Sequence, residues 1–240
     1  MITWVRSAGI IAFVAVATLF MASLSVLASF FSRSGDAVHR IARKWGWSIL
    51  AVSGIRVTLT GLERIDPSAS YIFMANHQST FDIPVLLAHL PVQFRWIAKA
   101  ELFRIPVFGR AMRGAGYISI KRDDRASAFQ SLEQAAERMR GGRSVMIFPE
   151  GTRSRDGALQ SFKKGGFVLA VDSRMPIVPV CISGTFAIMP KSTLKIQRQE
   201  VLLSINDPIA SSDYSRETKE ELMARVRQAI QQDLRRLRRV

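Results

Sequence analysis

An uncharged apolar run near the N-terminus constrains this chain more than any other feature. From Ser7 to Ser32 the sequence contains no Asp, Glu, Lys, Arg or His. As a helix this run is about 39 Å long, which exceeds the roughly 30 Å hydrocarbon core of a bilayer. A cleaved signal peptide is the alternative, but the apolar part of such a peptide usually spans only about 7–15 residues. The run therefore predicts a membrane anchor, which either crosses the bilayer with a tilt or enters it from one side.

The charges that flank the run predict its orientation. Arg6 precedes it, whereas four cations follow it closely: Arg33, Arg40, Arg43 and Lys44. Membrane helices carry an excess of Lys and Arg on their cytoplasmic flank. We therefore expect the protein in a cell (inner) membrane, with its main domain on the cytoplasmic side.

A second segment with helical periodicity follows the run. Its apolar residues recur at helical spacing: Ile41, Trp45, Ile49 and Val52. The uncharged part, residues 45–55, is too short to span a bilayer. Two interpretations stay open: an interfacial helix with Trp45 and Trp47 at the headgroup level, or a helix buried against the domain. After Gly54 the sequence changes to short β-like runs separated by helical patterns. We therefore expect membrane-associated helices in residues 1–54 and a folded domain in residues 55–240.

Composition narrows the class of partner. A net charge of +15 and an isoelectric point near 11.1 indicate an anionic partner, namely nucleic acid, an anionic membrane or a phosphorylated substrate. The chain has no helix-turn-helix, zinc-finger or RNA-binding signature, so we expect no nucleic acid. Cys181 is the one cysteine and cannot form a disulfide within the chain. No metal-ligand spacing occurs, and we expect neither a metal nor another cofactor.

The remainder of the chain has an α/β pattern. Seven short apolar runs predict strands, over residues 55–60, 71–75, 94–98, 117–120, 145–148, 177–182 and 201–205. Helical patterns lie between them, most clearly over residues 124–140 and after Thr218. Strands that alternate with helices predict an α/β fold, with a layered sheet flanked by helices.

The first polar cluster follows the second predicted strand. His77 and Asp82 lie in the segment Asn76-His77-Gln78-Ser79-Thr80-Phe81-Asp82. Histidine titrates near neutral pH and can act as a general base, and a carboxylate on its other ring nitrogen would fix its tautomer. Positions five apart do not share a helix face, so the pair requires a turn, with Asp82 near the start of a helix that has Pro84 in its first turn. An Asx-type turn with a surface histidine is the plainer alternative.

The second cluster, Phe148-Pro149-Glu150-Gly151-Thr152-Arg153-Ser154-Arg155, follows the fifth predicted strand. Ligand sites of α/β proteins concentrate at such strand ends, and arginine forks suit phosphate. The carboxylate of Glu150 could accept from an arginine or from a substrate hydroxyl. Arg122, Lys163 and Lys164 add positive charge nearby, although a solvated basic loop would have the same composition.

Together these segments resemble the glycerolipid acyltransferase family, and within it the lysophosphatidic acid acyltransferases. Four family motifs occur in order. They are N-H-x-x-x-x-D at Asn76, His77 and Asp82; G-x-I-x-I-x-R at Gly116, Ile118, Ile120 and Arg122; F-P-E-G-T-R-S from Phe148 to Ser154; and a proline within a β-run at Val178-Pro179-Val180. The likeness is close over residues 70–185. It implies a mixed sheet flanked by helices, as in glycerol-3-phosphate acyltransferases.

The resemblance also implies roles for individual residues. His77 would take the proton from the sn-2 hydroxyl of lysophosphatidic acid, and Asp82 would hold His77. The acyl donor would be acyl-CoA or acyl-carrier protein, and the product phosphatidic acid. The acceptor would be bound by Arg122, Glu150, Gly151, Thr152, Arg153 and Lys163. Ser79 would have no nucleophilic role.

Two alternatives remain open at this stage. The same motifs serve several acceptors, so another lyso-lipid, for example one based on an amino acid, could replace lysophosphatidic acid. A non-catalytic protein that binds anionic membranes would also account for the charge and the anchor, but it would leave the motifs unexplained.

Overall fold

The computed structural model describes residues 2–31, 34–121 and 142–237. The predicted helix over residues 124–140 and the site residue Arg122 lie outside this part of the chain. All seven predicted strands are confirmed to within two residues at each end. They are β1 (Arg56–Thr60), β2 (Ile72–Ala75), β3 (Phe94–Lys99), β4 (Ile118–Ile120), β5 (Ser144–Ile147), β6 (Ile177–Ser183) and β7 (Glu200–Ile205).

The strands form one mixed sheet in the order β1-β7-β6-β2-β5-β3-β4. Every neighbouring pair is parallel except β6 and β7, which are antiparallel. The central strands β2 and β5 are buried at every position. Burial on both faces explains why these two strands have uninterrupted apolar sequences rather than alternating ones. Because β6, β2, β5 and β3 are parallel neighbours, their carboxyl ends meet at one edge of the sheet.

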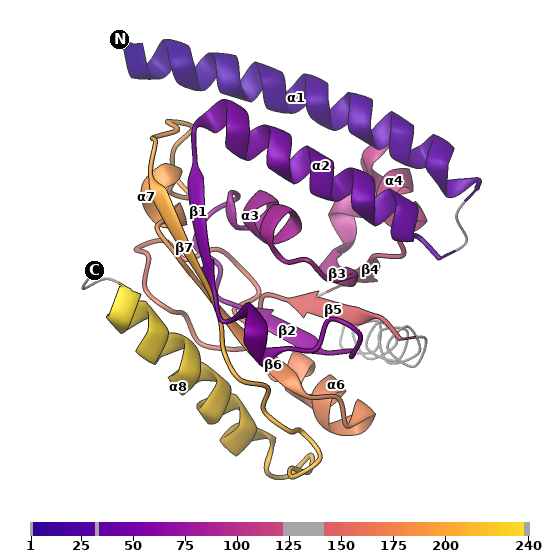
Figure 1. The fold of residues 1–240 in the computed structure, drawn as a ribbon, viewed down its shortest axis with the longest axis vertical. Helices are drawn as coiled ribbons and strands as arrows, with labels where there is room; N and C mark the ends of the chain where they lie inside the picture. The colour runs from indigo at the N-terminus through magenta and orange to yellow at the C-terminus, as the bar shows by residue number, and fades with distance from the viewer. Residues whose placement is uncertain (1, 32–33, 122–141, 238–240) are drawn as a thin grey trace.

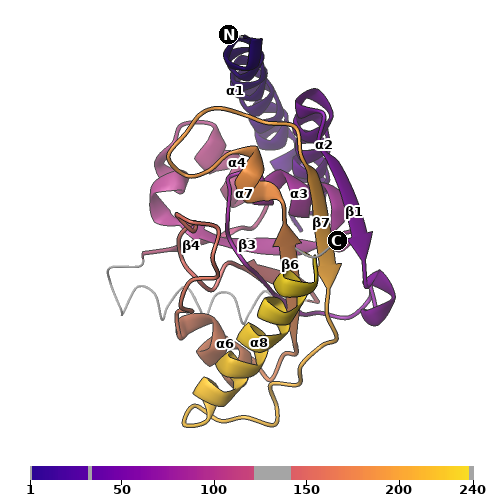
Figure 2. The same cartoon turned by 90° about the vertical axis from the view of Figure 1, so that its left-hand side faces the viewer.

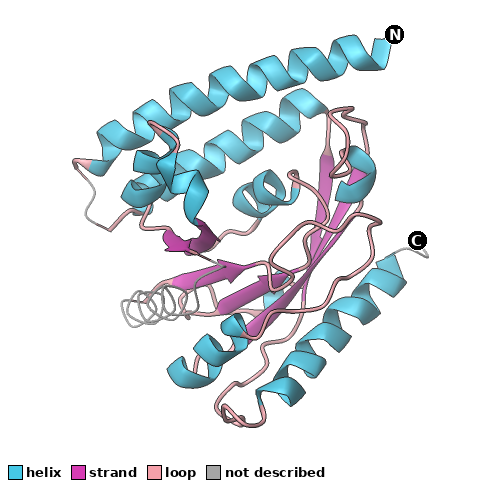
Figure 3. Cartoon of the chain, turned by 180° about the vertical axis from the view of Figure 1, so that it is seen from behind, coloured by secondary structure: helices cyan, strands magenta, loops and turns pink. Residues whose placement is uncertain are grey.

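Helices cover both faces of the sheet (Figures 1, 2 and 3). One face carries α2 (Asp36–Ser53), α3 (Asp82–His89) and α4 (Phe108–Gly114), with α1 (Ile2–Ser29) outside them. The other carries α6 (Gly165–Ser173) and α8 (Lys219–Leu237). Short helices η1 (Leu62–Arg64), η2 (Ala100–Arg104) and α7 (Thr185–Ile188) complete the described chain. Strand alternation divides the core, since Phe73 packs in the cluster on the α3 side while Ile72 and Met74 pack in the cluster on the α8 side.

Helix α1 lies against α2 and α4 rather than standing apart from the body (Figure 1). Ser7 accepts a hydrogen bond from the Ile196 backbone N–H at 2.9 Å, and Thr18 accepts one from Trp45 Nε1 at 3.0 Å. Its other side exposes large apolar residues, among them Val16, Leu19, Phe20 and Leu27. Residues Thr3–Ser29 are long and apolar enough to cross a membrane, by length and composition alone.

Helix α2 agrees with the second of the two interpretations, a helix packed on the domain, and the interfacial interpretation stays a prediction. Ile49 and Leu50 are buried in the core cluster that contains α3. Trp45 is partly buried beneath α1, whereas Trp47 and Val52 are exposed. The helix is therefore packed on the domain along one face and leaves an aromatic side chain at the surface. Its N-terminus is fixed by Asp36, which pairs with the buried guanidinium of Arg95 on β3 and with Arg143.

His39 of α2 is fully buried beside the sheet. Its Nδ1 lies 3.2 Å from the Tyr117 hydroxyl, and its ring meets the edge of Phe94 at a centroid distance of 4.6 Å. Burial, with the nearby charges of Arg95 and Arg43, lowers the pKa of His39 from 6.5 to about 3. The folded protein therefore holds this imidazole neutral at pH values well above 3.

The lowered pKa of His39 makes the stability of the folded protein depend on pH. Between pH 6.5 and pH 3 the unfolded chain binds a proton at His39 that the folded chain does not, so acid favours unfolding. From pH 7 to pH 5 the group alone costs about 2 kcal/mol of unfolding free energy. We expect the Tm of the wild-type protein to fall over this interval by several degrees more than that of His39→Asn, measured by thermal unfolding in detergent. Equal falls for the two proteins would contradict the assignment.

Candidate active site

Four parallel strands deliver polar residues to one edge of the sheet. The carboxyl end of β2 leads into Asn76 and His77, and that of β5 leads into the loop 148–160. The end of β3 supplies Lys99, and the segment after β6 reaches Lys191 by way of α7. Such an edge is the usual location of ligand sites in open α/β sheets.

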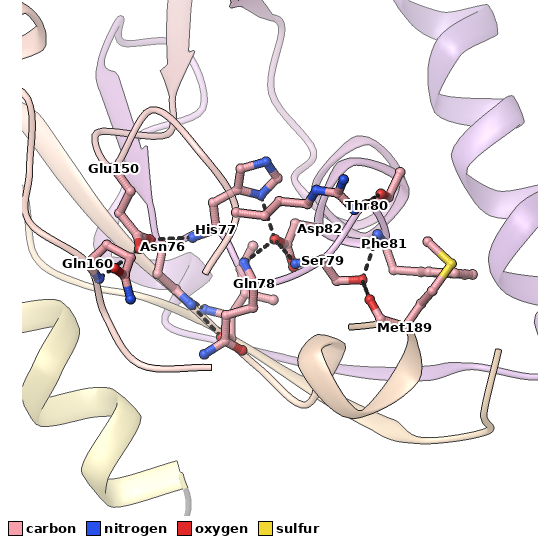
Figure 4. A network of polar contacts seen from close by, with 12 residues as sticks. Asn76, His77, Gln78, Ser79, Thr80, Phe81, Asp82, Glu150, Gln160 and Met189 are labelled. Carbon is pink, nitrogen blue, oxygen red and sulfur yellow. Dashed lines mark hydrogen bonds and ion pairs between the residues drawn. The ribbon is translucent and has the colours of Figure 1, made fainter. Parts of the chain in front are cut away.

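His77 and Asp82 meet across a tight turn at the start of α3 (Figure 4). The His77 Nδ1 atom lies 2.8 Å from Asp82 Oδ2, and the Asp82 side chain is fully buried. The same carboxylate oxygen accepts the backbone N–H groups of Gln78 at 2.7 Å and Ser79 at 2.9 Å. Asp82 is the first residue of α3, with Pro84 in the first turn, as the sequence predicts. The carboxylate is thus held in place by the turn that it closes, and His77 Nε2 points away from it.

The loop 148–160 holds the main chain of His77 from the other side. The Glu150 Oε1 atom accepts the His77 backbone N–H at 2.6 Å, and the Ser154 backbone N–H donates to the His77 carbonyl at 2.8 Å. Gln78 Nε2 donates to the Gly157 carbonyl at 2.8 Å. Gly151 has a φ of 72°, a left-handed conformation that glycine adopts without strain, and this turns the loop back. Two segments far apart in sequence therefore form one hydrogen-bonded unit.

Glu150 differs from its expected role. The resemblance implies contact with the acceptor, but Glu150 is only 2% exposed and its second oxygen accepts the Gln160 backbone N–H at 2.8 Å. Both carboxylate oxygens are thus used inside the protein (Figure 4). Burial raises the pKa of Glu150 to about 7, against the opposing effect of the two N–H donors. The geometry is that of a residue that positions His77 rather than one that faces a ligand.

An aromatic stack supports the imidazole. The His77 ring lies parallel to Phe148, with centroids 3.9 Å apart and planes 9° apart. Trp96 in turn stacks on Phe148, with ring centroids 5.3 Å apart. This arrangement was not predictable from the sequence, because Trp96 and Phe148 come from β3 and the end of β5 and meet only in the folded sheet.

An open cavity of about 590 Å³ begins at His77 and extends beneath α1 and α2. Most of its wall is apolar and comes mainly from α1, α2, α3, β3, η2 and α4. The lining residues include Met21, Ala22, Val38, Ala42, Ile83, Leu87, Ile97, Met112 and, just before β4, Tyr117. Its charged lining residues within the described chain, apart from His77, are the cations Lys99, Arg153 and Lys191, with no Asp or Glu. The cavity therefore suits a ligand that has both an apolar chain and a negative group.

The expected acceptor-binding residues divide into two groups. Gly151, Thr152 and Arg153 line the cavity together with His77, and Arg153 Nη1 donates to Thr80 Oγ1 at 2.7 Å. Lys163 is exposed and outside the cavity lining, and its backbone N–H donates to the Pro149 carbonyl at 2.7 Å. Lys191, which the motifs do not include, lines the cavity and donates to Thr152 Oγ1 at 3.0 Å.

Ser79 is placed for structure rather than for attack on a substrate. It is fully buried, and its hydroxyl donates to the Met189 carbonyl at 2.8 Å. Asn76 is likewise buried and joins β2 to β6, since its side chain both donates to the Ile182 carbonyl and accepts the Ile182 N–H. Both residues fix the turn that contains His77.

The chain belongs to the Acyltransferase family, whose model matches residues 56–183. In structure the chain is similar to the 1-acyl-sn-glycerophosphate acyltransferase PlsC of Thermotoga maritima. The TM-score is 0.83 and the sequence identity 29%, over 98% of this chain and 96% of that one. The predicted resemblance and the predicted fold class are both confirmed.

Relatives in sequence have the same name across distant organisms. The 1-acyl-sn-glycerol-3-phosphate acyltransferase of Borreliella burgdorferi is 32% identical over 75% of this chain and 72% of its own length. The chloroplastic 1-acyl-sn-glycerol-3-phosphate acyltransferase LPAT1 of Arabidopsis thaliana is 39% identical over 72% of this chain and 49% of its own length. The chain thus spans about half the length of the plant chloroplast relatives that it matches.

Proposed function

We propose that this protein transfers a fatty acyl group from an acyl thioester to the sn-2 hydroxyl of lysophosphatidic acid, which yields phosphatidic acid. The observation that carries the proposal is the His77–Asp82 pair, with a 2.8 Å contact, at the entrance of an apolar cavity flanked by cations. The names of the relatives in sequence and structure support the same acceptor.

The chemistry needs one base and no covalent intermediate on the protein. In this proposal His77 Nε2 takes the proton of the acceptor hydroxyl as its oxygen attacks the thioester carbonyl. The carbon–sulfur bond then breaks, and the thiolate that leaves recovers the proton from the imidazolium. Asp82 keeps the Nδ1 proton of His77 in place and stabilises the imidazolium. Glu150 holds the backbone N–H of His77, and Phe148 stacks against the face of its ring.

The apolar surfaces of the protein suit both the acyl donor and a membrane. Its apolar lining supports a role in accepting the acyl chain of the thioester, carried by CoA or by acyl-carrier protein. The exposed apolar side of α1 supports attachment to a cell (inner) membrane, with the catalytic domain on the cytoplasmic side as the flanking charges predict. In this scheme residues 1–54 bind an anionic membrane, and residues 55–240 carry the chemistry.

A turnover assay tests the proposal. The detergent-solubilised full chain is supplied with acyl-CoA and, separately, with acyl-carrier protein loaded with the same acyl group. Each donor is offered with a panel of lyso-lipids that includes lysophosphatidic acid and an amino-acid-based lyso-lipid. Transfer to lysophosphatidic acid supports the proposal. Transfer only to another lyso-lipid would keep the mechanism and overturn the acceptor, and binding of lipid without any transfer would favour a non-catalytic membrane protein.

Arg153 gives a first prediction about the acceptor. Its guanidinium, held by Thr80, is proposed to bind the acceptor phosphate together with Arg122. Arg153→Ala should raise the KM for lysophosphatidic acid by about tenfold to a hundredfold, because one charge-assisted hydrogen bond is worth roughly 1.5–3 kcal/mol. The KM for the donor should stay within about twofold. Arg155→Ala is the matched control, since Arg155 lies in the same loop but does not line the cavity. An unchanged acceptor KM in Arg153→Ala would contradict this role.

A further inference from the structure

A lysine outside the family motifs lines the cavity. Lys191 follows α7 and Pro190, in the segment that leads from β6 towards β7. Its side chain is partly buried, and its ammonium donates to Thr152 Oγ1 at 3.0 Å. Thr152 is the neighbour of Arg153 in the loop 148–160. Two cations from separate segments thus flank the same short stretch of loop.

The segment that carries Lys191 is tied to the turn that carries His77. Ser79, fully buried within that turn, donates to the carbonyl of Met189, two residues before Lys191, at 2.8 Å. Pro190 lies between them and restricts the backbone. The lysine is therefore fixed at both ends, through Met189 to the His77 turn and through its ammonium to Thr152. Its position relative to His77 is set by the fold and not by a mobile side chain alone.

The local electrostatics favour an anion at this point. Arg153 and Lys191 are held by the hydroxyls of Thr80 and Thr152, which carry no charge, and neither cation forms an ion pair with a carboxylate of the described residues. Within the described part of the chain, no carboxylate lines the cavity. Cations that converge on a partly enclosed, low-dielectric space attract and orient an anionic ligand.

We propose that Lys191 is a specificity-determining residue that contacts the phosphate of the acceptor. This inference rests on the proposed function and deepens it. In lysophosphatidic acid only two carbon atoms separate the hydroxyl oxygen that reacts from the oxygen that bears the phosphate. When that hydroxyl meets His77, the phosphate must therefore lie close to His77, and Lys191 lines the same cavity on a segment tied to the His77 turn. The phosphates of CoA lie at the far end of a long pantetheine arm and need no cation so near the base.

The experiment compares a phosphorylated acceptor with a neutral one. Lysophosphatidic acid and a monoacylglycerol with the same acyl chain are each measured for direct binding and for turnover, on the full chain in detergent. The variants are Lys191→Ala and Lys191→Arg, with Lys195→Ala as the matched control. Lys195 lies in the same segment but outside the cavity lining. Lys191→Ala should weaken the binding of lysophosphatidic acid by about tenfold to a hundredfold and change that of monoacylglycerol by less than about twofold.

The other arms separate this inference from the proposed function. Lys191→Arg should restore most of the lost affinity, because it keeps the charge, whereas Lys195→Ala should behave as wild type. Equal losses for both lipids, a rise only in the donor KM, or an effect no larger than that of Lys195→Ala would overturn the inference. If the wild-type protein binds both lipids but transfers to neither, the proposed function fails, and the binding comparison still decides the role of Lys191.

Discussion

His77→Ala should reduce kcat for acyl transfer by between about a hundredfold and ten-thousandfold, because general-base catalysis contributes acceleration of that order. Alanine removes the group that accepts the proton of the hydroxyl and leaves water as the only base. The fold should survive, since the His77 backbone bonds to Glu150 and Ser154 do not involve the ring. Steady-state turnover with saturating donor and lysophosphatidic acid measures the effect.

His89→Ala provides the comparison. His89 is at the end of the same helix, α3, where its ring packs on Trp47 at a centroid distance of 4.5 Å and lies away from the cavity lining. It should leave kcat within about twofold of wild type. Turnover by His77→Ala at the wild-type rate would remove His77 as the base. A similar loss in both variants would indicate damage to α3 instead.

The second large effect is expected for Asp82→Asn. The neutral amide can place an N–H group against Nδ1, which shifts the imidazole proton to Nε2 and blocks that atom as a base. It also stabilises the imidazolium less well, so we expect kcat to fall about a thousandfold or more while the acceptor KM changes little. The amide matches the backbone donors of Gln78 and Ser79 poorly, so a loss of about 1–3 kcal/mol in unfolding free energy should accompany the catalytic loss.

Kinetics and thermal unfolding on the same samples distinguish the two effects of Asp82→Asn. Asp172→Asn is the control, because it removes a carboxylate from α6 that is paired with Arg216 at the surface. It should alter neither kcat nor Tm by more than the error of measurement. A kcat for Asp82→Asn within tenfold of wild type would show that the Asp82 charge has little part in catalysis.

The strands were predictable because buried strands have a recognisable apolar pattern in the sequence. Buried parallel strands such as β2 and β5 give short continuous apolar runs, and these runs stand out against the helical patterns around them. The order of the strands was not predictable, nor was the antiparallel direction of β7 beside β6. Both depend on crossovers and packing between segments that are distant in sequence.

The site shows the same division between local and long-range information. The turn that joins His77 to Asp82 is local, and helix periodicity alone required it. The position of Glu150 in the motif suggested a ligand contact, whereas in the structure its carboxylate is buried and accepts the backbone N–H groups of His77 and Gln160. The one feature of the sequence that set Glu150 apart was a carboxylate placed among arginines. Lys191 had no such signal, because only the fold brings the segment after α7 beside Thr152.

Helix α1 also determines whether a shortened, water-soluble version of this protein can keep its cavity. Removal of an apolar N-terminal helix is the usual route to a water-soluble version of an anchored protein. Here Thr18, Met21, Ala22 and Ser25 of α1 form part of the cavity wall that begins at His77. A shortened chain that starts at α2 would open that wall to solvent and expose the apolar face that α1 covers. Under the proposed function, the helix proposed to attach the protein to the bilayer also forms part of the cavity proposed to hold the lipid, so truncation would remove both together.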